Sequence, residues 1–119
     1  MPNLDELYVL LRTWAVAKQV HTYTELSSRY QARTNDWFEP HGSWDAPLGE
    51  LNQRLHARIG APALSALVVL KKDPQEPGGG FWGCAPNVPA RPASDMARLT
   101  ERARIVNAVH AYNWPATLP

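Results

Sequence analysis

Prolines and glycines divide this chain into short stretches, and that division limits its fold more than any other feature of the sequence. Eleven prolines and seven glycines occur among 119 residues, and neither residue type is favourable inside a helix or a strand. The chain is nevertheless 45% apolar and only 19% charged, which is typical of a folded protein rather than a disordered one. We therefore expect a single domain, residues 1–119, built from helices of moderate length and very short strands.

Four segments carry apolar residues at the three- and four-residue spacing of an amphipathic helix. The second of these segments begins with Thr22 and Glu25 at capping-box spacing. The third starts from an Asp45 N-cap and ends at Gly60, because glycine favours the left-handed conformation that closes a helix. The expected helices are Leu4–Val20, Tyr23–Tyr30, Asp45–Ile59 and, after a cap at Ser94 or Asp95, a last helix to about Tyr112.

A short apolar run at residues 64–70, between the third and fourth helices, is typical of a buried strand. Phe81–Cys84 is its expected returning partner, so the two segments form a two-stranded wing with a projecting loop between them. A Pro-rich linker, residues 86–93, then joins this core of residues 1–85 to a C-terminal helix within residues 94–114. The expected fold class is α+β, mainly α, with a winged-helix-like order of three helices, a two-stranded β wing and a C-terminal helix.

Charge and cysteine content exclude several classes of protein. The chain has twelve Lys and Arg and eleven Asp and Glu, which gives a net charge of +1. This charge does not favour binding to nucleic acid or to an anionic membrane. The single cysteine, Cys84, excludes an internal disulfide and a closed zinc site, and it suits a cytoplasmic location. The longest apolar run is too short to span a membrane, and the four histidines lack metal-binding spacing. We expect no membrane partner, no metal and no cofactor.

Four short motifs lie between residues 20 and 83: HTYTEL at 21–26, PLGEL at 47–51, Pro62 ahead of a Val-Val pair, and GGFW at 79–82. Their order resembles the DNA-binding domain of the alkylguanine-DNA alkyltransferases and of the non-enzymatic alkyltransferase-like proteins. The resemblance implies a winged helix that binds DNA. This chain departs from that family at Pro62–Ser65, where the reactive Cys and the His of the family are missing, so no catalytic residue carries over. Residues 64–69 and 77–82 are also similar to small uncharacterised bacterial proteins.

Binding of DNA through the third helix and the wing is the first functional hypothesis. Arginine and glutamine are residue types that contact guanine, adenine and phosphate, and the outer face of the third helix carries both. Residues 20–83 hold six basic and seven acidic residues, however, a poor balance for a surface that faces phosphates. The candidate DNA-binding residues are Thr22, Tyr23, Gln53, Arg54, Arg58, Lys71 and Lys72.

A protein-interaction module on the same scaffold, such as an adaptor or an inhibitor of a larger complex, is the alternative hypothesis. Trp37 and Phe38 lie in a loop where aromatic side chains either bind a partner or anchor the loop on the core. Arg98 and Arg102 lie four residues apart beside apolar residues of the last helix. This mixed stripe meets a protein partner or a second copy of the chain, unless its apolar half belongs to the core.

A thiol-dependent enzyme built on Cys84 is the third class of function. A catalytic thiol needs a neighbouring base and an electropositive setting, and the sequence shows neither beside Cys84. We therefore expect no catalytic residue and no enzymatic activity.

Overall fold

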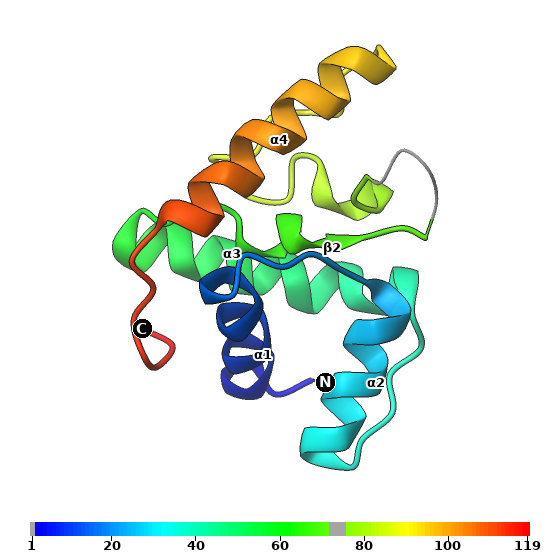
Figure 1. The fold of residues 1–119 in the computed structure, drawn as a ribbon, viewed down its shortest axis with the longest axis vertical. Coiled ribbons are helices and arrows are strands. Elements are labelled where there is room, and N and C mark those ends of the chain that lie inside the picture. Colours follow the sequence, from blue (N-terminus) through cyan, green and yellow to red (C-terminus); the bar gives the residue numbers. More distant parts are fainter. Residues whose placement is uncertain (1, 72–75) are drawn as a thin grey trace.

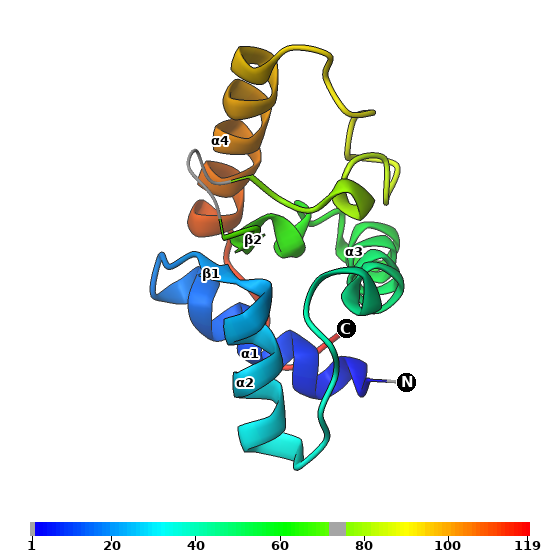
Figure 2. The same cartoon turned by 90° about the vertical axis from the view of Figure 1, so that its right-hand side faces the viewer.

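Helices account for most of the structure, which is a computed structural model that describes residues 2–71 and 76–119. Figure 1 shows α4 at one end of the molecule, α1 and α2 at the other, and α3 with a small sheet between them. Figure 2 shows the same three layers from the side. The helices are α1 (Leu4–Val16), α2 (Tyr23–Thr34), α3 (Asp45–Ile59) and α4 (Asp95–Ala111), and three short 3-10 helices are η1 (His41–Trp44), η2 (Leu64–Leu67) and η3 (Gly79–Phe81). The fold is thus α+β and mainly helical, as expected.

Local capping explains where the first two helices begin and end. The side chain of Asn3 accepts a hydrogen bond from the Glu6 N–H and starts α1, which ends four residues earlier than expected. It ends early because Lys18 adopts a left-handed backbone with φ of 58°. The capping box predicted for α2 is confirmed, since the Thr22 hydroxyl accepts from the backbone N–H of Glu25 and the Glu25 carboxylate accepts from that of Thr22.

The N-cap of α3 differs from its sequence prediction, although the helix has the expected bounds. Asp45 is the first residue of the helix, and the N-cap position belongs to Trp44 at the end of η1. The predicted end at Gly60 is confirmed, with a left-handed φ of 64°. Asp45 caps nothing because its carboxylate lies against the backbone of Gly80, where a Cβ would overlap it.

The two-stranded wing predicted from residues 64–70 and Phe81–Cys84 is wrong for the described residues. The strand β2 (Val68–Val69) pairs in parallel with β1 (His21–Thr22), with His21 opposite Val68. Residues 64–67 form η2 instead of a strand, and the glycine run folds back on Tyr23. The Gly78 N–H donates to the Tyr23 hydroxyl at 3.0 Å, and a Cβ on Gly78 would lie 2.8 Å from that oxygen. The glycines therefore allow a close packing contact rather than a hairpin turn.

The core lies where η2 passes between the helices. Leu64 and Leu67 are fully buried, and η2 contacts α1, α3 and α4. The segment expected to be a Pro-rich linker also packs, because Val88 is 5% exposed and Asn87 Nδ2 donates to the Ala61 carbonyl at 2.9 Å. Residues 86–93 are therefore part of the folded body.

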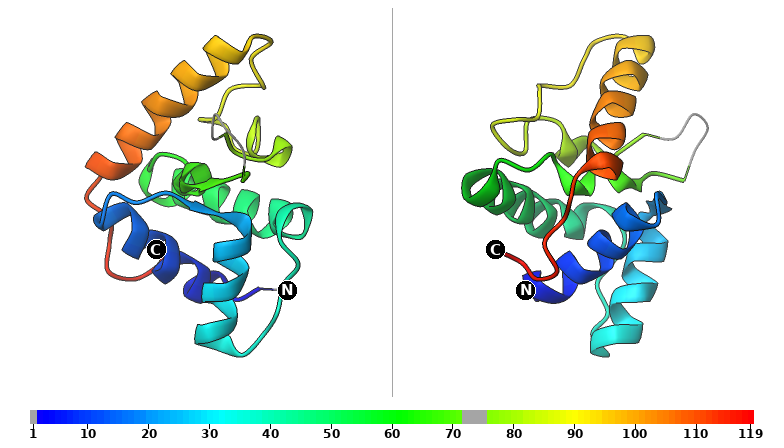
Figure 3. Two further views of the ribbon diagram at one scale, coloured as in Figure 1. Left: turned by 45° about the vertical axis from the view of Figure 1, so that its right-hand side comes forward. Right: turned by 60° about the vertical axis from the view of Figure 1, so that its left-hand side comes forward.

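The last helix has the predicted Ser94 cap, which accepts from the Ala97 N–H. After α4 the chain returns to α1, as Figure 3 shows. Trp114 is 4% exposed there, and the Tyr8 hydroxyl donates to the Pro115 carbonyl at 2.6 Å. This return anchors α4, which otherwise extends away from the rest of the fold (Figure 2).

Candidate functional site

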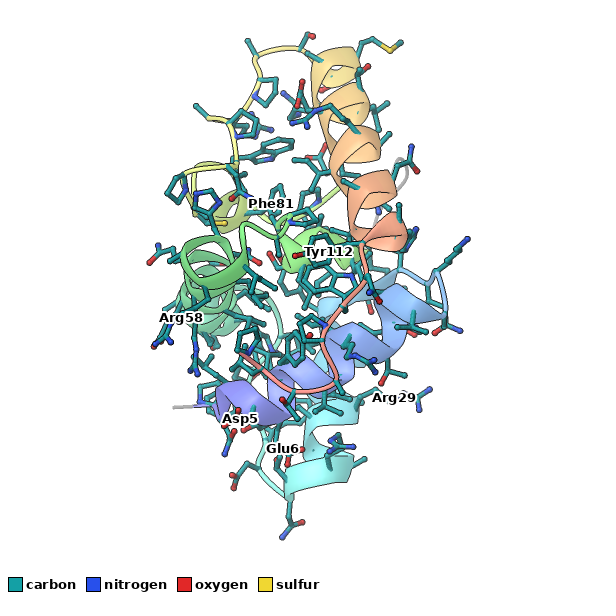
Figure 4. The ribbon with its side chains drawn as sticks, turned by 90° about the vertical axis from the view of Figure 1, so that its left-hand side faces the viewer. Asp5, Glu6, Arg29, Arg58, Phe81 and Tyr112 are labelled. Carbon is teal, nitrogen blue, oxygen red and sulfur yellow. The ribbon has the colours of Figure 1, made fainter. Side chains whose placement is uncertain are left out.

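A groove runs between the C-terminal end of α3 and α4. Its empty volume is about 670 Å³, including space that is open to solvent. Figure 4 looks onto this side of the molecule, with Tyr112 at the end of α4. The lining residues are Gly60, Pro62, Ala63, Asn87, Arg104, Ile105, Ala108 and Tyr112. Its lining combines apolar side chains with the polar groups of Asn87, Arg104 and Tyr112, a mixture that also occurs in ligand-binding sites.

Turns and hydrogen bonds fix the walls of the groove. The left-handed Gly60 directs the chain away from α3 toward Pro62. The Tyr112 hydroxyl donates to the Ile59 carbonyl at 3.3 Å, which ties the end of α4 to the end of α3. These contacts hold the ends of α3 and α4 together beside the groove.

Asn87 supplies a polar group that is only half satisfied. Its amide nitrogen donates to the Ala61 carbonyl, but its amide oxygen is buried and accepts no hydrogen bond. A buried acceptor without a donor costs free energy, so such an atom calls for an explanation.

Arg98, a predicted partner-binding residue, is 7% exposed and held within the chain. Its guanidinium donates to the carbonyls of Pro92 and Ala93 and to the carboxylate of Asp95. Its Nε also lies 3.6 Å from a carboxylate oxygen of Glu76. These contacts fix residues 92–95 and residue 76 against α4, so Arg98 acts within the fold.

Arg102, four residues further along α4, lacks the hydrogen bonds that Arg98 makes. It is half-buried, and its Nε and Nη2 atoms are buried without a hydrogen-bond partner. Burial lowers the pKa of this guanidinium because desolvation disfavours its charged form. Ile105 and Val109 are 4% and 0% exposed, so the stripe expected to meet a partner instead packs on the core in its apolar part. Arg102 is the residue of that stripe with two guanidinium nitrogens that make no hydrogen bond.

Of the three α3 residues predicted to contact DNA, two make hydrogen bonds within the molecule and one does not. Gln53 is exposed but its amide donates to the Cys84 carbonyl at 2.8 Å, whereas Arg54 donates to the Pro119 carbonyl at 2.8 Å. Arg58 is exposed and lies at the outer edge of α3 in Figure 4. Two of the three side chains are therefore engaged within the molecule.

The other predicted DNA contacts lie elsewhere. Thr22 caps α2, and Tyr23 is 3% exposed with its hydroxyl bonded to Gly78. Lys71 is exposed just after β2, and Lys72 lies outside the described residues. Figures 1 and 2 place the segment that leaves β2 away from the C-terminal end of α3, which carries Arg58. The structure does not bring the described members of this set, Thr22, Tyr23, Gln53, Arg54, Arg58 and Lys71, into one surface.

Trp37 and Phe38 lie at the α2 end, opposite α4. Phe38 packs on the core through an edge contact with Tyr30 and a tilted contact with Trp44, at ring distances of 5.7 and 5.4 Å. Trp37 is 47% exposed, and its indole N–H donates to Glu39. The loop aromatics and the arginines of α4 therefore do not form one patch, and Phe38 anchors the loop.

Cys84 borders a second, much smaller pocket beside Tyr23, Asp45 and Ser65. The side-chain nitrogen of Asn52 donates to Ser65 Oγ at 2.6 Å and to Cys84 Sγ at 3.3 Å. Burial raises the pKa of the Cys84 thiol, which keeps it protonated at neutral pH. This setting disfavours a nucleophilic role.

Comparison with protein-family models, with curated proteins and with solved structures gives no match to this chain. Over residues 2–71 and 76–119, no three His, Cys, Asp or Glu side chains are grouped so that they could hold a metal ion. No helix in the same two ranges combines the length and the apolar character needed to cross a membrane.

Sequence reasoning missed the groove because its residues are far apart in the chain. Asn87 lies in a Pro-rich stretch that reads as a linker, and Tyr112 lies at the predicted end of a helix. The one available signal is the basic and apolar stripe of the last helix, which led to Arg102 without showing its surroundings.

Proposed function

We propose that this protein is a non-enzymatic protein-interaction module that binds a segment of a partner protein in the groove beside α4. The observation that supports this most is the groove itself, whose lining combines apolar residues with the polar side chains of Asn87 and Arg104. A cytoplasmic location belongs to the same proposal, since the one cysteine is a free thiol.

The chemistry of the groove suits a peptide better than a small polar metabolite. Pro62 and Ala108 offer apolar surface for a side chain, and Asn87 and Arg104 place polar groups at the same groove. An extended peptide brings both kinds of group to a groove, which is a recurring mode of recognition.

Selection from a displayed library of short random peptides on the immobilised full chain tests this function. Ala108→Gln blocks the groove, and Ala103→Gln is its matched control, because Ala103 is exposed on the same helix and does not line the groove. We expect peptides selected on the native chain to lose binding to Ala108→Gln and to keep it for Ala103→Gln. Peptides that bind both variants equally, or a selection that yields none, would contradict the proposed function.

Non-specific or weak binding of DNA is a second candidate function, and the exposed outer face of α3 favours it. Glu50, Gln53, Ala57 and Arg58 are exposed there, and α1, α2 and α3 precede β2 in the order of a winged helix. In this proposal the scaffold is a winged-helix variant whose strand pairs with β1, and α3 meets the DNA.

Fluorescence anisotropy of labelled random duplex DNA tests that candidate. We expect binding at low salt that weakens as salt is added, since phosphate contacts release counterions. Arg58→Ala should reduce this binding, whereas Ala108→Gln should not. Absence of binding at low salt removes DNA as a ligand.

A further inference from the structure

A second pocket lies where η3 packs beside the first half of α3, as Figure 2 shows. Its empty volume is about 190 Å³, including space that is open to solvent, which is less than a third of the volume of the groove. Tyr23, Asp45, Gly80 and Cys84 are among the residues that line it, and none of its described lining residues belongs to the groove. The pocket is therefore a separate and narrower site.

The inner wall of this pocket is polar but brings no positive charge. Asn52 is 1% exposed, and its side-chain nitrogen donates to Ser65 Oγ and to Cys84 Sγ. Its amide oxygen accepts a hydrogen bond from the Ser65 N–H at 3.2 Å. Burial raises the pKa of the Cys84 thiol, so this group stays neutral.

Asp45 is the one Asp, Glu, Lys, Arg or His among the described residues that line the pocket. Within residues 2–71 and 76–119, no side chain forms an ion pair with its carboxylate, and no group donates a hydrogen bond to it. Asp45 opens α3, and the partial positive charge at the start of a helix offsets only part of a full negative charge. The pocket therefore has an unmatched negative charge.

Two glycines allow Asp45 and Tyr23 to lie against the backbone beside the pocket. A Cβ on Gly80 would lie 2.6 Å from Asp45 Oδ1, and a Cβ on Gly78 would lie 2.8 Å from the Tyr23 hydroxyl oxygen. Burial raises the pKa of this hydroxyl, and the negative charge of Asp45 raises it further. The carboxylate is thus close enough to the hydroxyl for its charge to act there.

We propose that this pocket binds the primary ammonium group of a lysine side chain from a partner protein, with the Asp45 carboxylate as its counter-ion. Asp45 is exposed, so a group that arrives from solvent can reach it. An ammonium group donates up to three hydrogen bonds, and a carboxylate is the acceptor that binds it most strongly. The compact charge and flexible four-carbon stem of lysine suit a narrow pocket better than the planar guanidinium of arginine. This inference goes beyond the proposed function, because the groove takes no part in it.

Amide NMR of the isotopically labelled full chain tests this inference by titration with lysine blocked as its N-acetyl, N-methylamide derivative. We expect saturable shifts at the amides of Gly49, Gly80 and Cys84, which line the pocket. The same derivative with an acetylated side-chain amine is the control ligand, because it keeps the stem and lacks the charge. It should cause no such shifts.

Asp45→Asn keeps the shape of the side chain and removes its charge, so it should weaken binding of the lysine derivative about fivefold. Asp36→Asn is the matched control, because Asp36 is also exposed and does not line the pocket. It should leave binding unchanged.

Three results would overturn this inference: no saturable shifts on the native chain, equal shifts with the acetylated derivative, or equal binding by Asp45→Asn. Each of them would leave the proposed function standing, since Ala108→Gln tests the groove separately. Failure of the peptide selection on the groove would likewise leave the lysine pocket standing.

Discussion

The side of the molecule formed by α1, α2 and residues 36–44 satisfies its buried polar groups, whereas the α4 side, formed by the second half of α3, residues 84–93 and α4, does not. On the first side, Trp44 is fully buried and its indole N–H donates to Ser27 Oγ at 2.9 Å. On the second side lie the buried side-chain atoms that lack hydrogen-bond partners among the described residues: His56 Nδ1, Asn87 Oδ1, Arg98 Nε, Arg102 Nε and Arg102 Nη2.

This difference separates a part whose polar groups are paired within the fold from the part in which we propose binding. Buried polar groups are almost always paired in native proteins, so an unpaired one calls for an explanation. The α4 side also holds the groove. We therefore expect substitutions on the first side to lower stability, and some substitutions on the second side to affect binding with little cost in stability.

Trp44→Ala should have the largest effect on stability. The side chain is 0% exposed and its ring centre lies 5.4 Å from that of Tyr30. Removing a buried tryptophan leaves a cavity that costs about 3–5 kcal/mol of unfolding free energy. Chemical denaturation followed by circular dichroism measures the loss. Trp44→Phe, which keeps most of the packing, should lose much less, and equal losses would contradict this explanation.

Arg98→Met should lower the free energy of unfolding by about 3 kcal/mol, because it removes a buried cation that donates to the carbonyls of Pro92 and Ala93 and lies beside the Glu76 carboxylate. The same denaturation experiment measures the change. If the variant were as stable as the native chain, then Arg98 would not connect residues 76 and 92–95 to α4.

Glu25→Gln should have a smaller effect that depends on pH. The Glu25 carboxylate accepts a hydrogen bond from the Thr22 N–H and lies 2.9 Å from the imidazole of His21. Both contacts lower the pKa of this carboxyl below its ordinary value. A carboxyl whose pKa is lowered by folding stabilises the protein above its unfolded pKa and loses this contribution as pH falls through its folded pKa. Denaturation midpoints at neutral and acid pH should differ less for the variant, and an unchanged difference would contradict the role of the capping box.

Arg102→Met should have the smallest effect, a change within about 0.5 kcal/mol of the native free energy of unfolding or a slight gain. The side chain gives up no hydrogen bond through Nε or Nη2, and its stem can still cover apolar surface. Denaturation of this variant beside Arg98→Met tests the comparison directly. A loss as large as that of Arg98→Met would show that Arg102 is satisfied within the fold.

Local features of the fold could be predicted from the sequence, but its long-range pairings could not. Capping by Thr22 with Glu25 and closure by Gly60 depend on neighbouring residues, and both predictions are confirmed. The partner of Val68 is His21, 47 positions earlier in the sequence. A two-residue strand has no pattern that shows which segment it meets, and Gly78–Gly80 supplied a misleading turn signal.

The candidate site was only partly visible in the sequence for the same reason. Arg102 was found because a helix repeats every three to four residues, so its stripe with Ile105 can be read directly. Its difference from Arg98 depends on carbonyls at residues 92 and 93, which the sequence does not place. Asn87 was hidden in a stretch with no periodicity at all.

Titration of the isotopically labelled full chain with a peptide selected on it, followed by amide NMR, tests the central claim most directly. Our account predicts that the largest shifts occur at the backbone amides of Ala63, Asn87 and Ala108, which line the groove. Shifts concentrated around Trp37 or on the outer face of α3 near Arg58, with the groove unchanged, would contradict it.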